Sequence, residues 1–514
     1  MADMTCAPLD VPSNASETTV VRVVRTVRAY SGRLDALFLR PGGPTSSASH
    51  SDDFLLGEGG PGAGSVRREF DTAKIRDSSC FAESWRRNDM SESVVPTFSL
   101  AERDRRWHLA RTFMEREGLD ALLVFGEHED AGPAPVAYDT WFTNGRPGTT
   151  VVFPRTGEPI SLLPGPMFIM DHLESSRRGD IMWIPPRNLR GTRHSGMIAE
   201  TLREFGLARA VIGVVGLGPH MPWHPEGIIP HGLWNNVLTR FPEADFRPVD
   251  VPFGQLIMPL GQEEIAALRH SARIGDAMVE AMVATAAPGV PENRVYAAGM
   301  AEGYGHGSLP AAMHLWSGPD VVAAGPPAWG HRPQAPRVLD DGDIIYAEVF
   351  SNFGGRHTQN QVTITVGDVH EDFHRAAEVA RAAYDAGLKA LRPGRTFGDV
   401  VDAMHEPIDA AEGWPFLIAV HSLNPGLSVG KGRGLFSRIP GAEGYPRVPD
   451  HPTFLPDMEL VPGMSFAFEP NYAFGRHLVH VGGTVVVGDD EPIELSPYTT
   501  RILRATGTAV SSPV

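Results

Sequence analysis

The sequence is poor in cysteine: among its 514 residues only Cys6 and Cys80 are cysteines. Two cysteines cannot build the disulfide framework that stabilises small secreted domains. Both precede residue 98, and the candidate chemistry lies beyond that point. A thiolate nucleophile is therefore excluded there, because none is available.

Long apolar runs and an excess of basic residues are also missing. No apolar segment approaches the roughly 18 residues that span a bilayer, so we expect no membrane segment. The first residues lack a basic stretch followed by an apolar one, so we expect no secretory signal and a cytoplasmic location. The formal net charge is −17. Because nucleic-acid binding needs a basic surface, we expect no nucleic-acid partner.

The chain is too long for one ordinary domain and divides into three parts by composition. Within residues 1–96, the stretch 41–67 is dense in Gly, Ser, Pro and charge and cannot bury a core. We therefore predict that residues 1–96 are disordered or untranslated, with Met90 as a natural start. The remaining parts are predicted to be domains, at 97–258 and 259–508.

Helix and strand patterns alternate in the middle part, which predicts an α/β domain. Ser99 is a suitable N-cap for a helix that ends at Gly118. Short runs of apolar residues predict strands, and apolar residues spaced three and four positions apart predict a further helix. The strands are expected at 121–125, 149–153, 159–163 and 210–215, and the helix at 198–205.

Paired strands and paired helices in the last part predict an α+β architecture. His405 and Glu406 are expected on the solvated face of one of these helices. The helices are predicted at 263–286, 372–391 and 397–411, and the strands at 343–350, 361–366, 463–470 and 484–487.

Four segments of the last part gather polar residues of the kinds that carry chemistry. Taken alone, each has an ordinary explanation, such as a carboxylate at a sheet edge or an arginine exposed to solvent. The segments are 330–333, Glu348 with 355–361, His421 to Arg433, and Pro462 to Pro470.

Glu469 lies at the end of an apolar strand pattern. Alternation along a strand places it on the face of Ser465 and Ala467, while Phe466 and Phe468 point to a core. A carboxylate beside small residues leaves room for a ligand.

The order and spacing of the four segments resemble the creatinase, aminopeptidase P and prolidase superfamily of M24-like peptidases. The signatures are Gly-Asp-Ile at 342–344, before a strand, and Pro-Gly-Met at 462–464, followed by Glu-Pro at 469–470. The resemblance covers roughly residues 98 to 505. It implies a C-terminal pita-bread catalytic domain, a creatinase-type N-terminal α/β domain and a homodimer.

Metal-dependent members of that superfamily hold two divalent cations with two Asp, one His and two Glu. The corresponding residues here are Glu348, Gln359, His421, Glu469 and Gly482. Two ligands are lost and one is altered, which predicts that no dinuclear centre forms. A single divalent metal at Glu348, His421 and Glu469 remains open.

The pattern is closest to that of creatinase, a member that works without metal. The resemblance implies that His331 is the general acid/base, that Arg433 binds a substrate carboxylate and that Glu469 holds a nitrogen donor. Arg146 is expected to be a second carboxylate-binding arginine, donated by the partner subunit.

His357 and Gln361 depart from the creatinase pattern, because they replace a tyrosine and a glutamate. The loss of a carboxylate suggests a substrate that is less cationic than creatine. Glu348, Gln359 and His421 are expected to supply further polar contacts with the substrate.

The sequence thus predicts a metal-independent hydrolase of a C–N bond in a small, amino-acid-like substrate. Three alternatives stay open. The first is an Xaa-Pro dipeptidase- or aminopeptidase-type metallopeptidase with an atypical site. The others are a lyase acting on a similar zwitterion and a non-catalytic pita-bread binding protein.

Overall fold

The computed structural model describes most of the chain beyond residue 94. The described residues all fall within one compact unit, Asp77–Val514. In this part of the chain, no helix combines the length and the apolar character needed to cross a membrane. The predicted extension, 1–96, lies outside the described residues except for its last two. The described ranges are 95–126, 138–218, 226–309, 311–416, 418–434 and 438–511.

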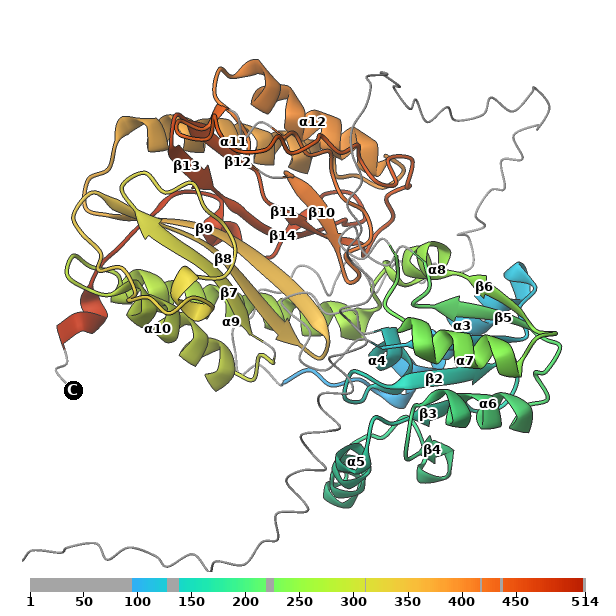
Figure 1. Ribbon diagram of the computed structural model, residues 1–514. Helices are drawn as coiled ribbons and strands as arrows, with labels where there is room; N and C mark the ends of the chain where they lie inside the picture. The colour runs from blue at the N-terminus through green and yellow to red at the C-terminus, as the bar shows by residue number, and fades with distance from the viewer. Residues whose placement is uncertain are drawn as a thin grey trace, which may run out of the picture. The chain divides into compact units, whose positions relative to one another are not determined.

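The first sheet has six strands in the order β4-β3-β2-β1-β5-β6 (Figure 1). Its central strand β1 pairs antiparallel with β2 and parallel with β5. Leu122 and Val124 of β1 face one apolar cluster, whereas Leu123 and Phe125 face another, as strand alternation requires. The strands are β1 Ala121–Phe125, β2 Thr150–Pro154, β3 Ile160–Leu162, β4 Leu189–Arg190, β5 Val211–Val215 and β6 Asp245–Pro248.

Helices cover both faces of this sheet, which confirms the predicted helix–strand alternation. The cap of the first helix is also confirmed: Ser99 Oγ accepts the Glu102 N–H at 3.2 Å, and Gly118 ends the helix with a φ of 66°. Helices α3 Leu100–Glu117, α4 Tyr138–Thr143 and α8 Asp250–Ile257 share one core. Helices α6 Ser195–Glu204 and α7 His231–Arg240 share the other, and α5 spans Pro166–Arg178.

The second sheet has eight strands, and its main path is β10-β11-β14-β9-β8-β7. Strand β15 pairs with β14, and β16 pairs with β9, while β12 and β13 form a separate two-stranded sheet. The strands are β7 Ala312–Gly318, β8 Asp343–Phe353, β9 Arg356–Val366, β10 Val420–Leu423, β11 Ser465–Phe468, β12 Asn471–Phe474, β13 His477–His480, β14 Gly482–Val486, β15 Ile493–Glu494 and β16 Leu503–Arg504.

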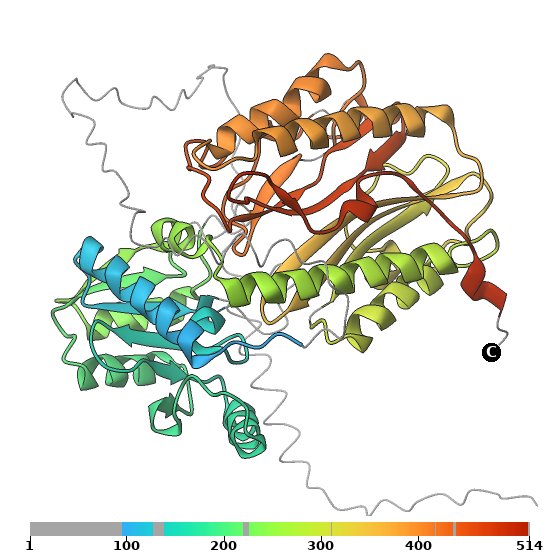
Figure 2. The same ribbon diagram turned by 180° about the vertical axis from the view of Figure 1, so that it is seen from behind.

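Helix pairs lie on opposite sides of this second sheet (Figures 1 and 2). Helices α9 Gln262–Thr285 and α10 Glu292–Gly305 pack on one side, and α11 Glu371–Ala390 and α12 Phe397–Ala410 pack on the other. The predicted inward face of the strand before Glu469 is confirmed, because Phe466 and Phe468 lie in the core under α11 and α12. The predicted α+β class is likewise confirmed.

Glu264, in the first turn of α9, joins three parts of the fold. Its carboxylate is fully buried and lies 2.6 Å from Arg105 Nη2 on α3 and 3.0 Å from Arg356 Nη2 on β9. Arg106 Nη2, also on α3, lies 3.3 Å away. Burial alone would raise the pKa of Glu264, but the charges of Arg106, Arg356 and Arg105 lower it. This stabilisation is present above the ordinary pKa of a glutamate and is lost as the pH falls through the lowered value.

We expect Glu264→Gln to lower the free energy of unfolding by about 3–5 kcal/mol, because it leaves buried guanidinium groups without their counter-charge. Urea unfolding measures the loss. Glu280, which is exposed on the same helix, is the matched control; Glu280→Gln should change stability by less than about 0.5 kcal/mol. Equal effects of the two substitutions would contradict the role given to Glu264.

Candidate functional site

Polar residues on three neighbouring strands of the second sheet lie in one row, which ends at Gly482 on a fourth strand. The strand register pairs His314 of β7 with Glu348 of β8, Glu348 with Gln361 of β9, and Gln361 with Gly482 of β14. Residues directly opposite each other on neighbouring strands lie on the same face and interact. The register thus brings together residues that are far apart in the sequence.

Hydrogen bonds join Gln361 to two other predicted site residues, and one of these contacts a third. Gln361 Nε2 donates to Glu469 Oε2 at 3.2 Å and to Gln359 Oε1 at 3.3 Å. His421 Nε2 lies 3.1 Å from Gln359 Oε1 and 3.8 Å from Glu469 Oε1. We call Glu348, Gln359, Gln361, His421 and Glu469 the polar cluster.

The two carboxyl groups of the polar cluster titrate in opposite directions. Burial and the charge of Glu348 raise the pKa of Glu469 well above its ordinary value. Burial would also raise the pKa of Glu348, but a hydrogen bond and charge from His314 lower it, with help from His480 and His421. Environments that separate two carboxyl pKa values in this way favour one neutral and one ionised group.

Both ring nitrogens of His421 face oxygen atoms. Nδ1 lies 2.8 Å from the carbonyl oxygen of Ser422, and Nε2 faces Gln359 Oε1. A doubly protonated ring satisfies both oxygens, yet burial lowers the pKa of His421. The two hydrogen-bond acceptors thus favour the protonated ring, whereas the cost of burying its charge favours the neutral ring.

Sequence reasoning missed two histidines beside the polar cluster. His314 Nδ1 lies 3.1 Å from Glu348 Oε2, on a strand that was not predicted. His480 is buried and stacks on Tyr346 with ring centroids 5.1 Å apart. Burial lowers the pKa of His480 to about 4, against the raising effect of Glu348. The alternation of Met313, His314 and Leu315 before Gly318 was the available signal for β7.

The residues at the expected ligand positions do not fit a dinuclear metal centre. Among the described residues, Glu348, His421 and Glu469 belong to no trio of His, Cys, Asp or Glu side chains whose ligand atoms lie within 4.8 Å of one another. Gly482 supplies no ligand, and a Cβ built there would lie 2.0 Å from the carbonyl oxygen of Phe468. A side chain at this position would therefore displace the backbone of the neighbouring strand.

Among the described residues, no hydrogen bond or ion pair links His331 to the polar cluster. His331 is exposed just after the turn Ala328–Gly330, where its backbone N–H donates to the Ala328 carbonyl oxygen at 3.3 Å. The same loop is tied to helix α10, because Trp329 Nε1 donates to Glu292 Oε1 at 2.9 Å.

His357 and Arg146 lie in different parts of the fold: His357 precedes Gln359 by two residues on β9, and Arg146 belongs to the first sheet's domain. His357 is buried on β9, and its backbone N–H and carbonyl both bond to the Asn424 side chain, at 2.8 and 3.0 Å. Burial lowers the pKa of His357 to about 4, with a further contribution from Arg356. Arg146 lies over the ring of Phe168, 4.6 Å from its centroid, within the first sheet's domain.

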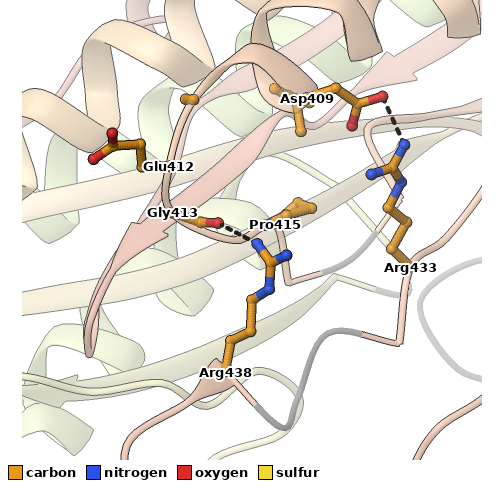
Figure 3. Close-up of a pocket in the computed structure, with 8 residues that line it drawn as sticks. Asp409, Glu412, Gly413, Pro415, Arg433 and Arg438 are labelled. Atoms are coloured by element: carbon orange, nitrogen blue, oxygen red, sulfur yellow. Dashed lines mark hydrogen bonds and ion pairs between the residues drawn. The ribbon is translucent and has the colours of Figure 1, made fainter.

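Arg433 lines a pocket at the end of α12 (Figure 3). Its Nη2 donates to Asp409 Oδ2 at 2.7 Å, and the neighbouring Arg438 Nη1 donates to the Gly413 carbonyl oxygen at 3.0 Å. The pocket has a volume of about 360 Å³. Two guanidinium groups thus face one hollow, and each already has an acceptor from the protein.

Comparisons with known proteins agree with this architecture. Residues 266–489 match the profile of metallopeptidase family M24. A probable dipeptidase PepE of Mycobacterium tuberculosis is 28% identical over 181 residues, which cover 34% of this chain and 43% of the dipeptidase. A creatinase of a Bacillus species is 23% identical over 391 residues, 74% of this chain and 85% of the creatinase. The matched part thus spans less than half the length of the dipeptidase.

A solved structure shows the same fold at low sequence identity. The X-Pro aminopeptidase of Thermotoga maritima superposes with a TM-score of 0.58 and 14% identity, over 77% of this chain and 99% of its own. The eight-stranded sheet and its helix pairs are therefore an M24-type pita-bread domain. Residues 266–489 thus match metallopeptidase family M24, and the chain is similar to members of the creatinase, aminopeptidase P and prolidase superfamily.

We expect that a carboxylate cannot be restored at position 482 by a single substitution. Gly482 has a φ of 137°, which strains any other residue, and the Phe468 carbonyl fills the space of a side chain. Gly482→Glu should lower the free energy of unfolding by at least about 1–3 kcal/mol, as measured by urea unfolding, and bind no second Mn²⁺.

Gly232→Ala is the control for that substitution, since a Cβ at this position on α7 meets no atom within 4 Å. It should change stability by less than about 1 kcal/mol. A Gly482→Glu protein of unchanged stability that takes up two Mn²⁺ ions would refute the steric argument.

Proposed function

We propose that this protein hydrolyses a C–N bond in a small amino-acid-like substrate, and that the polar cluster does so without a bound metal ion. The observation that carries the proposal is the hydrogen-bond chain from Glu469 through Gln361 and Gln359 to His421. Three groups of this chain, Gln359, His421 and Glu469, correspond to metal-ligand positions in the superfamily, and Gln361 links Glu469 to Gln359.

The roles follow from the chemistry of the side chains. Glu469, with its raised pKa, can present a neutral carboxyl to a nitrogen of the substrate or orient an attacking water. Glu348 is held by His314 at 3.1 Å and supplies the opposing negative charge. Gln359, Gln361 and His421 provide the polar contacts between these two carboxyl groups.

Proton relay is assigned to His331, because an imidazole ring can accept a proton at one nitrogen and donate one from the other. The side chain is exposed to solvent, with which it can exchange protons. The assignment requires that the loop after Ala328–Gly330 brings His331 against the bound substrate.

Recognition of a substrate carboxylate is assigned to Arg433 and to Arg146. Guanidinium groups bind carboxylates with two parallel hydrogen bonds, which gives both affinity and orientation. For Arg433, the substrate would replace Asp409 as the acceptor in the pocket of Figure 3. Arg146 would act across the interface of a homodimer.

A second candidate function is favoured by the similarity to the mycobacterial dipeptidase and by the family match. In that case the protein is a metallopeptidase with one divalent ion held by Glu348, His421 and Glu469. The three side chains would have to move together, because they form no group within 4.8 Å among the described residues.

A substrate panel distinguishes these functions. It should contain creatine, cyclic amidines, N-acyl amino acids and Xaa-Pro dipeptides, assayed by product release in the presence of a chelator. We expect hydrolysis of a non-peptide member under these conditions. Cleavage of Xaa-Pro dipeptides only after addition of Mn²⁺ would support the metallopeptidase instead.

Two substitutions test the assigned roles. Glu469→Gln and His331→Ala should each lower kcat by about 10²- to 10⁴-fold, the usual contribution of a general acid or base. Thermal unfolding should show that the His331→Ala protein is folded, since this side chain is exposed. His108→Ala, at an exposed position on α3, is the control and should retain full turnover. Full activity of His331→Ala would remove His331 from the mechanism.

A further inference from the structure

We propose that His370, Asp372 and His477 form a second, separate binding site for a divalent transition metal. Among the described residues, this is the one trio of His, Cys, Asp or Glu side chains whose ligand atoms all lie within 4.8 Å of one another. It belongs neither to the polar cluster nor to the ligand positions of the superfamily, and it does not rest on the proposed function.

Two elements bring the three residues together. His370 is the N-cap of α11, and Asp372 lies in the first turn of that helix. His477 is the first residue of β13, directly after the turn that joins β12 and β13. Helix α11 packs against both strands of this hairpin.

The distances suit a tetrahedral ion. Asp372 Oδ2 lies 3.5 Å from His370 Nδ1 and 3.5 Å from His477 Nδ1. Metal–ligand bonds of about 2.0–2.2 Å at tetrahedral angles separate neighbouring ligand atoms by about 3.3–3.5 Å. One carboxylate oxygen and two imidazole nitrogens are therefore spaced as three ligands, with the fourth position left for water.

The two histidine rings must rotate for an ion to bind. They stack with centroids 4.1 Å apart and an interplanar angle of 3°, and lone pairs in parallel planes do not meet at one point. His370 Nδ1 also accepts the backbone N–H of Asp372 at 3.2 Å, a cap that binding would replace. His477 Nδ1 is inaccessible to solvent and has no hydrogen-bond partner among the described residues, although Asp372 Oδ2 lies 3.5 Å away.

The arginine residues around the site contact only one oxygen of the Asp372 carboxylate, so the second oxygen is available to an ion. Arg375 Nη1 donates to Asp372 Oδ1 at 2.6 Å, and its guanidinium lies over the ring of Phe474. Arg476, in the turn next to His477, pairs with Asp320 at 3.3 Å. Arg375 thus occupies only Oδ1 of Asp372, and Arg476 pairs with Asp320, while Asp372 Oδ2 faces the two histidines.

The ligand set selects the kind of ion. Two imidazoles and one carboxylate suit Zn²⁺, Co²⁺ or Ni²⁺ rather than Mg²⁺ or Ca²⁺, which prefer oxygen ligands.

Strand β13 connects this site to the polar cluster. It runs from His477 to His480, about 10 Å along the strand, and the charge of Glu348 acts to raise the pKa of His480. A bound ion would fix the hairpin to α11 and thereby steady the wall of the polar cluster.

Cobalt titration of chelator-treated protein tests the site, because Co²⁺ bound to nitrogen and oxygen ligands absorbs visible light. We expect one tight equivalent for the wild-type protein and a rise in Tm with Co²⁺ or Zn²⁺. Asp372→Asn and His477→Gln should each weaken this binding at least tenfold, and should remove the rise in Tm. Melting curves in the presence of chelator verify that both variants are folded.

His108→Gln, an exposed histidine on α3, is the matched control and should bind like the wild type. The proposal is overturned if the Asp372→Asn and His477→Gln proteins titrate like the wild type. It is also overturned if the wild-type protein takes up no equivalent more tightly than the His477→Gln protein. Neither result depends on which substrate the polar cluster accepts.

Discussion

The buried carboxylate of Glu264 is the constraint on which the arrangement of this protein depends. It is held between arginines from α3 and from β9, and it opens the long helix α9 that underlies the second sheet. A buried ion pair stabilises only when each charge keeps its partners, so these segments must stay in contact. Since Arg356 begins β9, the same contact fixes the strand that carries Gln359 and Gln361.

The register of the second sheet then determines the chemistry of the site. It aligns His314, Glu348, Gln361 and Gly482 across four strands. Gln361 departs from the creatinase pattern, and Gly482 departs from the pattern of the metal-dependent members. Gln361 contributes an amide that bridges Glu469 and Gln359, and Gly482 lets the carbonyl of Phe468 approach closely. His314 supplies a partner for Glu348, with its Nδ1 3.1 Å from Glu348 Oε2.

Much of the fold could be predicted from apolar periodicity. The Ser99 cap, strand β1 and the inward face of Phe466 and Phe468 follow directly from spacing. Helix α10 was missed because it contains two internal glycines, Gly299 and Gly303, besides its last residue, Gly305, and glycine is a poor helix former. Strand β7 was missed although it alternates, because it follows proline and ends at Gly318.

The site was harder to predict because its geometry depends on long-range pairing. Five of the expected site residues lie in one cluster, namely Glu348, Gln359, Gln361, His421 and Glu469. Arg433, which was expected at the same site, donates a hydrogen bond to Asp409 instead. His405 was expected on a solvated face, and this was wrong: it is 2% exposed. It lies one turn from Val401 and close to Ile408 on α12, so it continues the apolar stripe of that helix. Periodicity alone could not show that a polar ring is buried there.

The central claim is that the polar cluster has exchanged metal ligation for hydrogen bonding. The most direct test is metal analysis of the His477→Gln protein, which removes the separate site proposed at α11, after chelation and re-exposure to Mn²⁺. Turnover of the preferred substrate is measured on the same samples. The account predicts less than one retained equivalent and the same turnover with and without Mn²⁺. Two retained equivalents, with turnover that disappears on chelation and returns with Mn²⁺, would contradict it.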